Sequence, residues 1–143
     1  MAIIRKASVV WSGDIKSGKG EISTESGALS GYPYGFAARF EGAKGSNPEE
    51  LLGAAHASCF TMALAGELGK AGLTAERLET KARITLDKEG EGWAIKSSHL
   101  TLEATIPGAD DATFQRIAAT AKANCPLSKV IKADISLEAT LKP

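Results

Sequence analysis

One stretch near the middle of the chain decides the fold: Asn47-Pro48-Glu49-Glu50-Leu51-Leu52-Gly53-Ala54-Ala55-His56-Ala57-Ser58-Cys59-Phe60-Thr61-Met62-Ala63-Leu64. It predicts a helix with a defined start, because Asn47 is a favoured N-cap, Pro48 suits the first helical position and Glu50 stands where a capping box needs an acidic side chain. Glu49 and Glu50 also face the positive end of the helix dipole.

The rest of this helix has almost no charge. From Leu51 to Ala65 the only side chain that can carry a charge is His56. Apolar and small residues cover every face, so the pattern predicts a helix that is buried all round. The run is too short and too rich in Gly, Ala, Ser and His for a membrane span. Cys59 lies near its middle, and this is where we expect chemistry.

Length and composition exclude several classes of protein. The chain has 143 residues, a formal net charge of zero and two cysteines. We expect one domain over residues 1–143. A neutral chain without a basic run argues against a nucleic-acid partner and against an anionic membrane surface. The start, Met1 to Lys6, lacks the features of a signal peptide. We therefore expect a cytoplasmic protein, in which a cysteine is either an inert buried side chain or a reactive thiol.

Alternating apolar and polar residues predict strands on both sides of the central helix. A change of phase near Ser97-Ser98 indicates a β-bulge. Asp110 or Asp111 starts a second helix, which Cys125-Pro126 ends. The resulting order, β-β-β-α-β-β-α-β, predicts an α+β fold with largely antiparallel pairing and helices on one face. The predicted strands cover residues 3–11, 20–26, 34–40, 78–86, 93–106 and 133–141, and a short helical turn covers residues 127–131.

The two thiols, Cys59 and Cys125, allow a redox interpretation and an inert one. In the redox interpretation one thiolate attacks an oxidant, becomes a sulfenic acid and condenses with the other thiol. A buried thiol needs a nearby cation to be a good nucleophile. Arg39, His56 and Lys129 are candidates for that cation. Helix-dipole arguments favour Cys125, which precedes Pro126, so the residues alone leave open which thiol attacks.

Two non-redox functions compete with this interpretation. His56 and Cys59 have helical ligand spacing, and His99 with Cys125 would complete a zinc site, although zinc templates use tight pairs at both ends. The other alternative is a small-ligand-binding protein without catalytic activity. No phosphate-binding glycine loop follows a strand into a helix, so a nucleotide is not expected.

Several motifs together resemble the OsmC/Ohr family of thiol-dependent organic hydroperoxide reductases. They are the central stretch from Asn47 to Phe60, Trp11-Ser12-Gly13-Asp14, Tyr34-Gly35-Phe36, Arg39-Phe40-Glu41-Gly42 and Asn124-Cys125-Pro126-Leu127-Ser128. The arginine just before the central helix is similar to the OsmC (osmotically inducible) branch rather than to Ohr. The resemblance implies an OsmC-like fold, largely antiparallel sheets packed around a central buried helix, in an intertwined homodimer.

The resemblance also implies roles for four residues. The activity that it implies needs no cofactor or metal. Cys59 matches the peroxidatic thiolate and Cys125 the resolving thiol. Arg39 matches the arginine that stabilises the thiolate and orients the peroxide, and Glu49 the carboxylate that holds this arginine. The implied substrate is an organic hydroperoxide, and the implied reductant is a thiol, often a lipoylated protein, in oxidative or osmotic stress defence. We expect the pocket for the organic group to contain Phe60, Met62 and Ile131.

The spacing of Glu49 and Cys59 predicts how such a site assembles. Ten residues of one helix separate them by ~15 Å along its axis, so one chain's Glu49 does not easily serve its own Cys59. If two such helices pack antiparallel about a two-fold axis near Ala54, each Glu49 lies beside the partner's Cys59. Gly53, Ala54, Ala55 and Ala57 are small enough for that packing. We therefore expect an obligate dimer with two composite sites.

Overall fold

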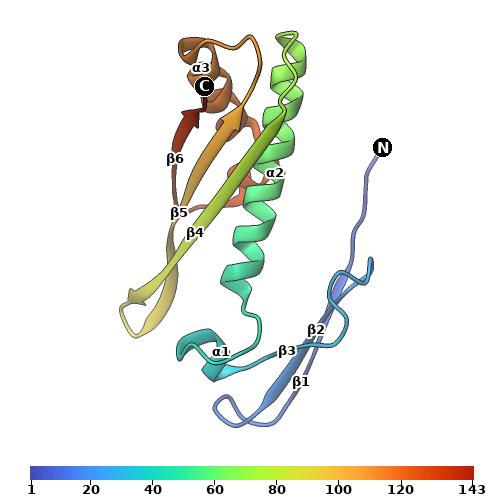
Figure 1. Ribbon diagram of the computed structural model, residues 1–143. Helices are drawn as coiled ribbons and strands as arrows, with labels where there is room; N and C mark the ends of the chain where they lie inside the picture. The colour runs from blue at the N-terminus through green and yellow to red at the C-terminus, as the bar shows by residue number, and fades with distance from the viewer. The chain divides into compact units, whose positions relative to one another are not determined.

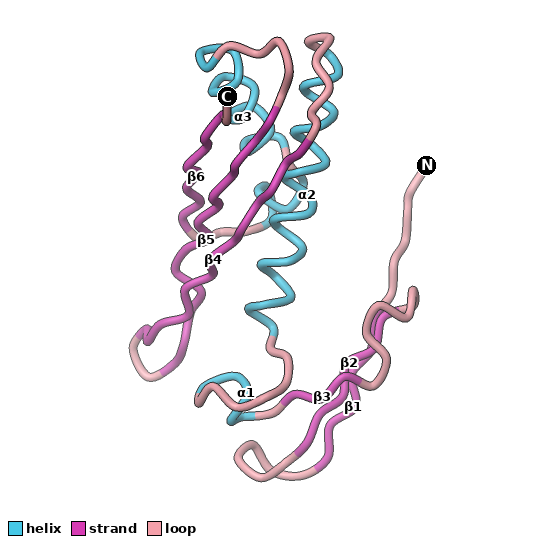
Figure 2. Tube along the Cα trace, viewed as in Figure 1, coloured by secondary structure: helices cyan, strands magenta, loops and turns pink.

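The computed structural model describes residues 1–143, which fold as two compact units, Met1–Leu51 and Leu52–Pro143. A single domain over the whole chain stays a prediction. The α+β class is confirmed, with two three-stranded sheets and four helices (Figures 1 and 2). In chain order the elements are β1 Ala7–Ser12, β2 Lys19–Thr24, β3 Tyr32–Tyr34, α1 Phe36–Phe40, α2 Pro48–Lys70, β4 Arg77–Glu89, β5 Gly92–Thr105, α3 Asp111–Asn124, α4 Pro126–Val130 and β6 Asp134–Leu141.

The first unit contains an antiparallel sheet in the order β1-β2-β3. The predicted hairpin of the first two strands is confirmed. Strand β1 begins at Ala7 rather than Ile3, because Ala7 pairs with Thr24, the last residue of β2. Beyond that pair the chain turns at Gly27, whose φ of 80° suits a glycine.

The predicted strand over residues 34–40 is wrong. Strand β3 ends at Tyr34, and the short helix α1 follows it (Figure 2). The rings of Phe36 and Phe40 pack one helical turn apart, with centroids separated by 5.0 Å. Arg39 N–H donates to the Gly35 carbonyl over 3.1 Å. Alanine, which fills the middle of this run, is the strongest helix former, and the run is too short for its period to be recognised.

The predicted start of α2 at Asn47 is confirmed. The Asn47 side-chain oxygen accepts a 2.8 Å hydrogen bond from the backbone N–H of Glu50. The return bond of the capping box differs from the usual one, because Glu50 Oε2 accepts from the Asn47 side-chain amide over 2.9 Å. At the far end, Leu73 N–H donates to the Leu68 carbonyl over 2.9 Å and Gly72 has a φ of 73°, which is a glycine C-cap.

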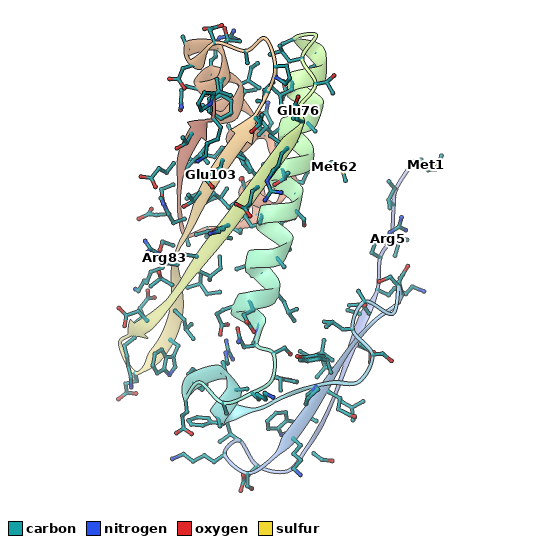
Figure 3. All side chains as sticks on the ribbon, in the orientation of Figure 1. Met1, Arg5, Met62, Glu76, Arg83 and Glu103 are labelled. Carbon is teal, nitrogen blue, oxygen red and sulfur yellow. The ribbon has the colours of Figure 1, made fainter.

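Within one chain α2 is not buried all round. Its inner face is fully buried and consists of His56, Phe60, Leu64 and Leu68. Met62 is 78% exposed and projects outward from α2 (Figure 3). The prediction is wrong for one chain because the second unit supplies a single sheet, which covers a single face of the helix.

The length of α2 corrects the prediction that this run is too short for a membrane span. At 23 residues it is long and apolar enough to cross a bilayer on length and composition alone. However, its inner face carries a histidine hydrogen-bonded to two serines and packs into the hydrophobic core of the second unit. That is the arrangement of a core helix in a globular protein.

The second unit is a β4-β5-β6 sheet with α2 and α3 packed on its apolar face (Figure 1). Strands β4 and β5 are antiparallel, and Lys96 is the extra residue between the pairs Thr85–Ser97 and Leu86–Ile95. The predicted β-bulge is thereby confirmed. Strand β6 pairs with β5 in parallel, since α3 and α4 form a crossover between them.

Helices α3 and α4 also match the sequence pattern. Asp110 caps α3 by accepting from Thr113 N–H over 3.1 Å. Cys125 ends α3 and is the N-cap of α4, since Pro126 cannot continue the first helix but suits the start of the next. The core of this unit comprises Phe60, Leu64, Leu68, Leu100, Leu102, Ala104, Ile106, Phe114, Ile117, Ala118, Ala121 and Cys125.

Candidate functional site

The two cysteines, Cys59 and Cys125, meet at the edge of the core of the second unit. Cys59 is half-buried on α2, and Cys125 is fully buried at the junction of α3 and α4. Their side chains are hydrogen-bonded, and both are free thiols. They are 66 residues apart in sequence (125 − 59). The fold therefore brings the two thiols together, as the formation of a disulfide requires.

Within this unit the environment of Cys59 favours the neutral thiol. Burial raises the pKa of Cys59 above its ordinary value, and the hydrogen bond with Cys125 raises it further. A hydrogen bond from the backbone N–H of Leu127 offsets part of this rise in the pKa. No cation of the second unit contributes to the shift. A reactive thiolate therefore needs an additional positive charge.

His56 is not that cation. It is 0% exposed, and burial lowers its pKa, so the ring is neutral at physiological pH. Its Nδ1 lies 2.7 Å from Ser98 Oγ and its Nε2 lies 2.9 Å from Ser128 Oγ. Both ring nitrogens thus have a hydroxyl partner.

The rival zinc site is not assembled. Neither ring nitrogen of His56 is open to a metal ion. His99 instead contacts Ser136 on β6, and no group of three or more His, Cys, Asp or Glu side chains is gathered in a way that would hold a metal.

Arg39 and Glu49 form a bidentate ion pair within the first unit. Arg39 Nε donates to Glu49 Oε1 over 3.1 Å, and Nη2 donates to Oε2 over 3.0 Å. The Glu49 side chain is 11% exposed and that of Arg39 is 37% exposed. This two-bond geometry fixes the plane of the guanidinium group. The predicted contact between these two residues is thus present, and it forms inside one chain.

Arg39 also lines an aromatic pocket of about 300 Å³ in the first unit. The Trp11 and Tyr34 rings pack with centroids 5.6 Å apart. Gly20 lets these rings come together, because a Cβ there would lie 2.3 Å from Tyr34 Cε1. The other pocket residues are Ile15, Gly35, Phe36 and Phe40. The pocket combines apolar walls with one fixed cation.

The expected pocket of Phe60, Met62 and Ile131 is wrong for the single chain. Phe60 is fully buried in the core, whereas Met62 is exposed. Two positions separated by two residues on a helix point in nearly opposite directions, so these side chains cannot line one cavity.

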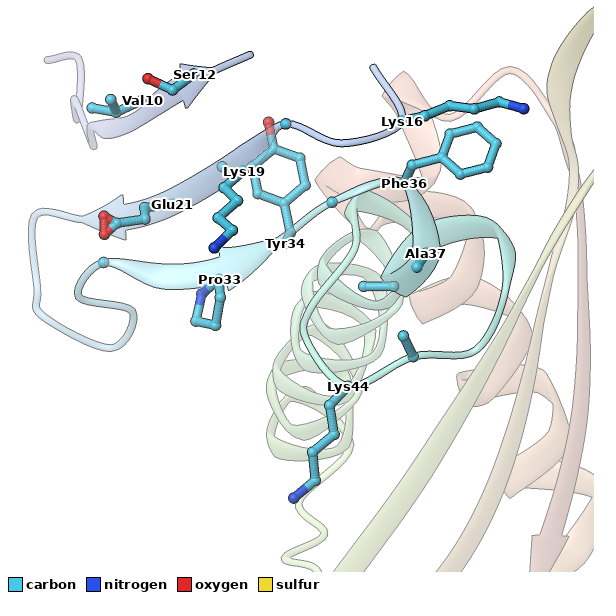
Figure 4. A pocket seen from close by; sticks show the side chains of 16 residues that line it. Val10, Ser12, Lys16, Lys19, Glu21, Pro33, Tyr34, Phe36, Ala37 and Lys44 are labelled. Carbon is cyan, nitrogen blue, oxygen red and sulfur yellow. The ribbon is translucent and has the colours of Figure 1, made fainter. Parts of the chain in front are cut away.

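A larger hollow in the first unit lies over β2 and β3 (Figure 4). Lys16, Lys19 and Lys44 reach it from three segments, and the Lys16 ammonium lies 5.7 Å from the centroid of the Phe36 ring. None of the four predicted site residues lines this hollow.

Sequence reasoning missed the hydroxyl partners of His56 and the aromatic pocket beside Arg39. The only local signal for Ser128 is its place three residues after Cys125 at the start of α4. Trp11, Tyr34 and Phe36 belong to the family motifs, but their grouping depends on the fold.

An α+β chain with a dithiol pair in one unit and an arginine–carboxylate pair in the other has the parts of a cysteine-based redox protein. Comparisons with known proteins agree. A family model described as OsmC-like protein matches residues 41–140. The chain is 54% identical over 142 residues to Peroxiredoxin OsmC of Escherichia coli, with 99% of each chain covered. It is 30% identical over 103 residues to the organic hydroperoxide resistance protein of Xanthomonas axonopodis, covering 70% of this chain and 69% of that protein.

A solved structure supports the same family relationship. The organic hydroperoxide resistance protein OhrB of Bacillus subtilis superposes with a TM-score of 0.68 at 26% identity, covering 96% of this chain and 98% of that one. The chain therefore belongs to the OsmC-like family. Its greater identity to the OsmC relative than to the Xanthomonas protein agrees with the predicted branch.

Proposed function

We propose that this chain is a thiol-dependent peroxidase that reduces organic hydroperoxides to alcohols. Cys59 is the peroxidatic residue and Cys125 the resolving residue. The observation that carries the proposal is the contact between these two free thiols. The relatives, a peroxiredoxin and two organic hydroperoxide resistance proteins, support a peroxide-detoxifying oxidoreductase.

The reaction proceeds in three steps. The Cys59 thiolate attacks the distal oxygen of ROOH, the O–O bond breaks, and RO⁻ takes a proton and leaves as the alcohol. The sulfenic acid of Cys59 then condenses with the Cys125 thiol, which forms the disulfide and releases water. Two external thiols, for example the dihydrolipoyl group of a lipoylated protein, reduce the disulfide and become oxidised in turn.

Arg39 supplies the positive charge that the first step needs. Burial alone makes Cys59 a poor nucleophile, because it raises the pKa of the thiol. A guanidinium near the sulfur favours the thiolate and also offers N–H donors to the peroxide oxygens. Glu49 holds that guanidinium with two hydrogen bonds, and so has a positioning role.

The sites are composite and need a homodimer. Helix α2 is unbroken from Pro48 to Lys70, so Glu49 and Cys59 are separated by ~15 Å along one axis. In an antiparallel pair of α2 helices centred on Ala54, the Arg39–Glu49 pair of one chain serves Cys59 of the other. This assembly also makes the two compact units parts of one OsmC-like domain.

The exposed face of α2 fits such a dimer. A groove of about 700 Å³ runs between α2 and β4, with Ala54, Ala57, Ser58, Thr61, Met62 and Ala65 on one wall and Leu78, Glu79 and Thr80 on the other. Small residues allow close helix approach, and Met62 is an exposed apolar side chain that a partner would cover.

The substrate is an organic hydroperoxide rather than hydrogen peroxide. The aromatic pocket beside Arg39 offers apolar surface to the organic group, and the arginine anchors the peroxide end. Hydrogen peroxide gains nothing from the aromatic walls. A role in oxidative or osmotic stress and a cytoplasmic location complete the proposal.

Stopped-flow consumption of cumene hydroperoxide, with dithiothreitol as reductant, tests the assignment of Cys59 and Cys125. Cys59→Ser should abolish turnover. Cys125→Ser should complete a single turnover without forming an intramolecular disulfide. Equal activity of the wild type and Cys59→Ser would refute the proposal and favour a non-catalytic ligand-binding protein.

A further inference from the structure

Close in the chain to both thiols is a bridge of three polar side chains, Ser98–His56–Ser128, in which His56 and Ser98 are fully buried and Ser128 is half-buried. His56 lies on α2 one turn before Cys59, Ser98 on β5, and Ser128 on α4. The ring is 0% exposed, with 2.7 Å from Nδ1 to Ser98 Oγ and 2.9 Å from Nε2 to Ser128 Oγ. The bridge thus ties three elements of the second unit together.

A neutral imidazole satisfies this arrangement in only two ways. One ring nitrogen donates and the other accepts, while a serine hydroxyl does either. Removal of either hydroxyl leaves one ring nitrogen buried without a partner, which is destabilising. The two bonds are therefore similar in their chemistry and differ in the element that each one holds.

The bond to Ser128 holds α4, and α4 contacts Cys59 twice. Its N-cap is Cys125, whose side chain is hydrogen-bonded to that of Cys59, and the backbone N–H of Leu127 also bonds to the Cys59 sulfur. Helix α4 has only five residues, and none of them is fully buried. An element with so little buried surface depends on specific bonds for its place.

We propose that His56 is a positioning residue for disulfide formation, which it promotes by holding α4, and Cys125 with it, against Cys59. The inference rests on the proposed peroxidase function. The step that it serves is the attack of the Cys125 sulfur on the sulfenic sulfur of Cys59, with loss of water. The bond to Ser98 anchors the same ring to the sheet but does not hold α4.

Two serine variants form a matched pair. Ser128→Ala and Ser98→Ala each leave one nitrogen of His56 unpaired, but only Ser128→Ala releases α4. After one equivalent of cumene hydroperoxide, rapid quenching with dimedone traps the sulfenic acid, and mass spectrometry follows its conversion to the disulfide. Ser128→Ala should slow this conversion by about tenfold, and Ser98→Ala by about twofold or less.

A second measurement needs no peroxide. In glutathione redox buffers, Ser128→Ala should lower the equilibrium constant of the Cys59–Cys125 disulfide by about tenfold relative to Ser98→Ala. Ser128→Thr keeps the hydroxyl and should restore both quantities, whereas the equally large Ser128→Val should not. If Ser128→Ala does not fold, the comparison of Ser128→Thr with Ser128→Val still tests whether the Ser128 hydroxyl positions Cys125.

Equal values for Ser128→Ala and Ser98→Ala in both measurements would overturn the inference. Failure of the proposed function has a different signature. In that case the wild type forms no sulfenic acid with cumene hydroperoxide, while the glutathione equilibrium still separates the two alanine variants and supports the positioning of Cys125.

Discussion

The composite site predicts that two defective chains restore one working site when they pair. One chain carries Glu49→Gln and keeps Cys59, and the other carries Cys59→Ser and keeps Glu49. Glutamine loses the charge and one of the two acceptors that now hold Arg39 at 3.1 and 3.0 Å. One hydrogen bond to a charged group contributes about 1.5–3 kcal/mol. Because the Arg39 side chain is 37% exposed, solvent weakens this interaction, and we take the lower end of that energy range.

A loss of about 1.5 kcal/mol corresponds to about a tenfold lower rate constant for peroxide in the Glu49→Gln homodimer. In the mixed dimer, composite sites place the intact Cys59 beside the intact Glu49. One of the two sites is then fully active, and the mixed dimer should have about half the activity of wild type. If each site used Glu49 and Cys59 of a single chain, one site would lack Cys59 and the other would work about tenfold more slowly. The mixed dimer should then have only about a twentieth of the wild-type activity.

The assay is stopped-flow consumption of cumene hydroperoxide by mixed dimers purified through two different affinity tags. Glu50→Gln provides the matched control, because Glu50 is the neighbouring helix-start carboxylate and contacts Asn47 rather than Arg39. Paired with Cys59→Ser, it should give about half of the wild-type activity in either arrangement. If the mixed dimer with Glu49→Gln has only about a twentieth of the wild-type activity, the composite site is refuted.

Three further predictions concern the arginine, the buried histidine and the dimer surface. Arg39→Lys loses the two-bond geometry with Glu49, so the midpoint pH for alkylation of Cys59 by iodoacetamide should rise; an unchanged midpoint contradicts the role of Arg39. Burial lowers the pKa of His56 below its ordinary value of 6.5, so below that pH the unfolded chain binds a proton that the folded chain excludes. The free energy of unfolding should therefore fall as the pH drops below about 6.5, by at most ~1.4 kcal/mol per pH unit, and urea titrations of His56→Gln should show a shallower fall. Ala54→Glu places two carboxylates at the proposed two-fold axis and should give monomers in sedimentation. Thr85→Glu, on the exposed side of β4, should stay dimeric. A dimeric Ala54→Glu protein would exclude the proposed interface.

Much of the fold follows from local signals in the sequence. The alternation in β4 and β6, the bulge in β5 and the apolar face of α3 are consequences of side-chain period. The caps Asn47 and Asp110 follow from side-chain hydrogen bonding near a helix start. These features depend on neighbouring residues, which is why one sequence suffices to find them.

Other features depend on the whole fold. Helix α1 was missed because five residues do not show a period, and the exposed face of α2 because composition cannot tell a protein interior from an uncovered surface. His56 bonds to residues 42 and 72 positions away, so no local pattern reveals its partners. The pairing of Cys59 with Cys125 was one of two interpretations that the residues alone allowed, and only the family resemblance implied which thiol attacks.

The most direct test of the central claim is the state of the two cysteines after one turnover. The reduced wild-type protein receives one equivalent of cumene hydroperoxide without added thiol, and peptide mapping by mass spectrometry measures the products. We expect one Cys59–Cys125 disulfide and one molecule of cumyl alcohol for each peroxide consumed. Consumption of the peroxide with Cys59 left as a free thiol would contradict the account.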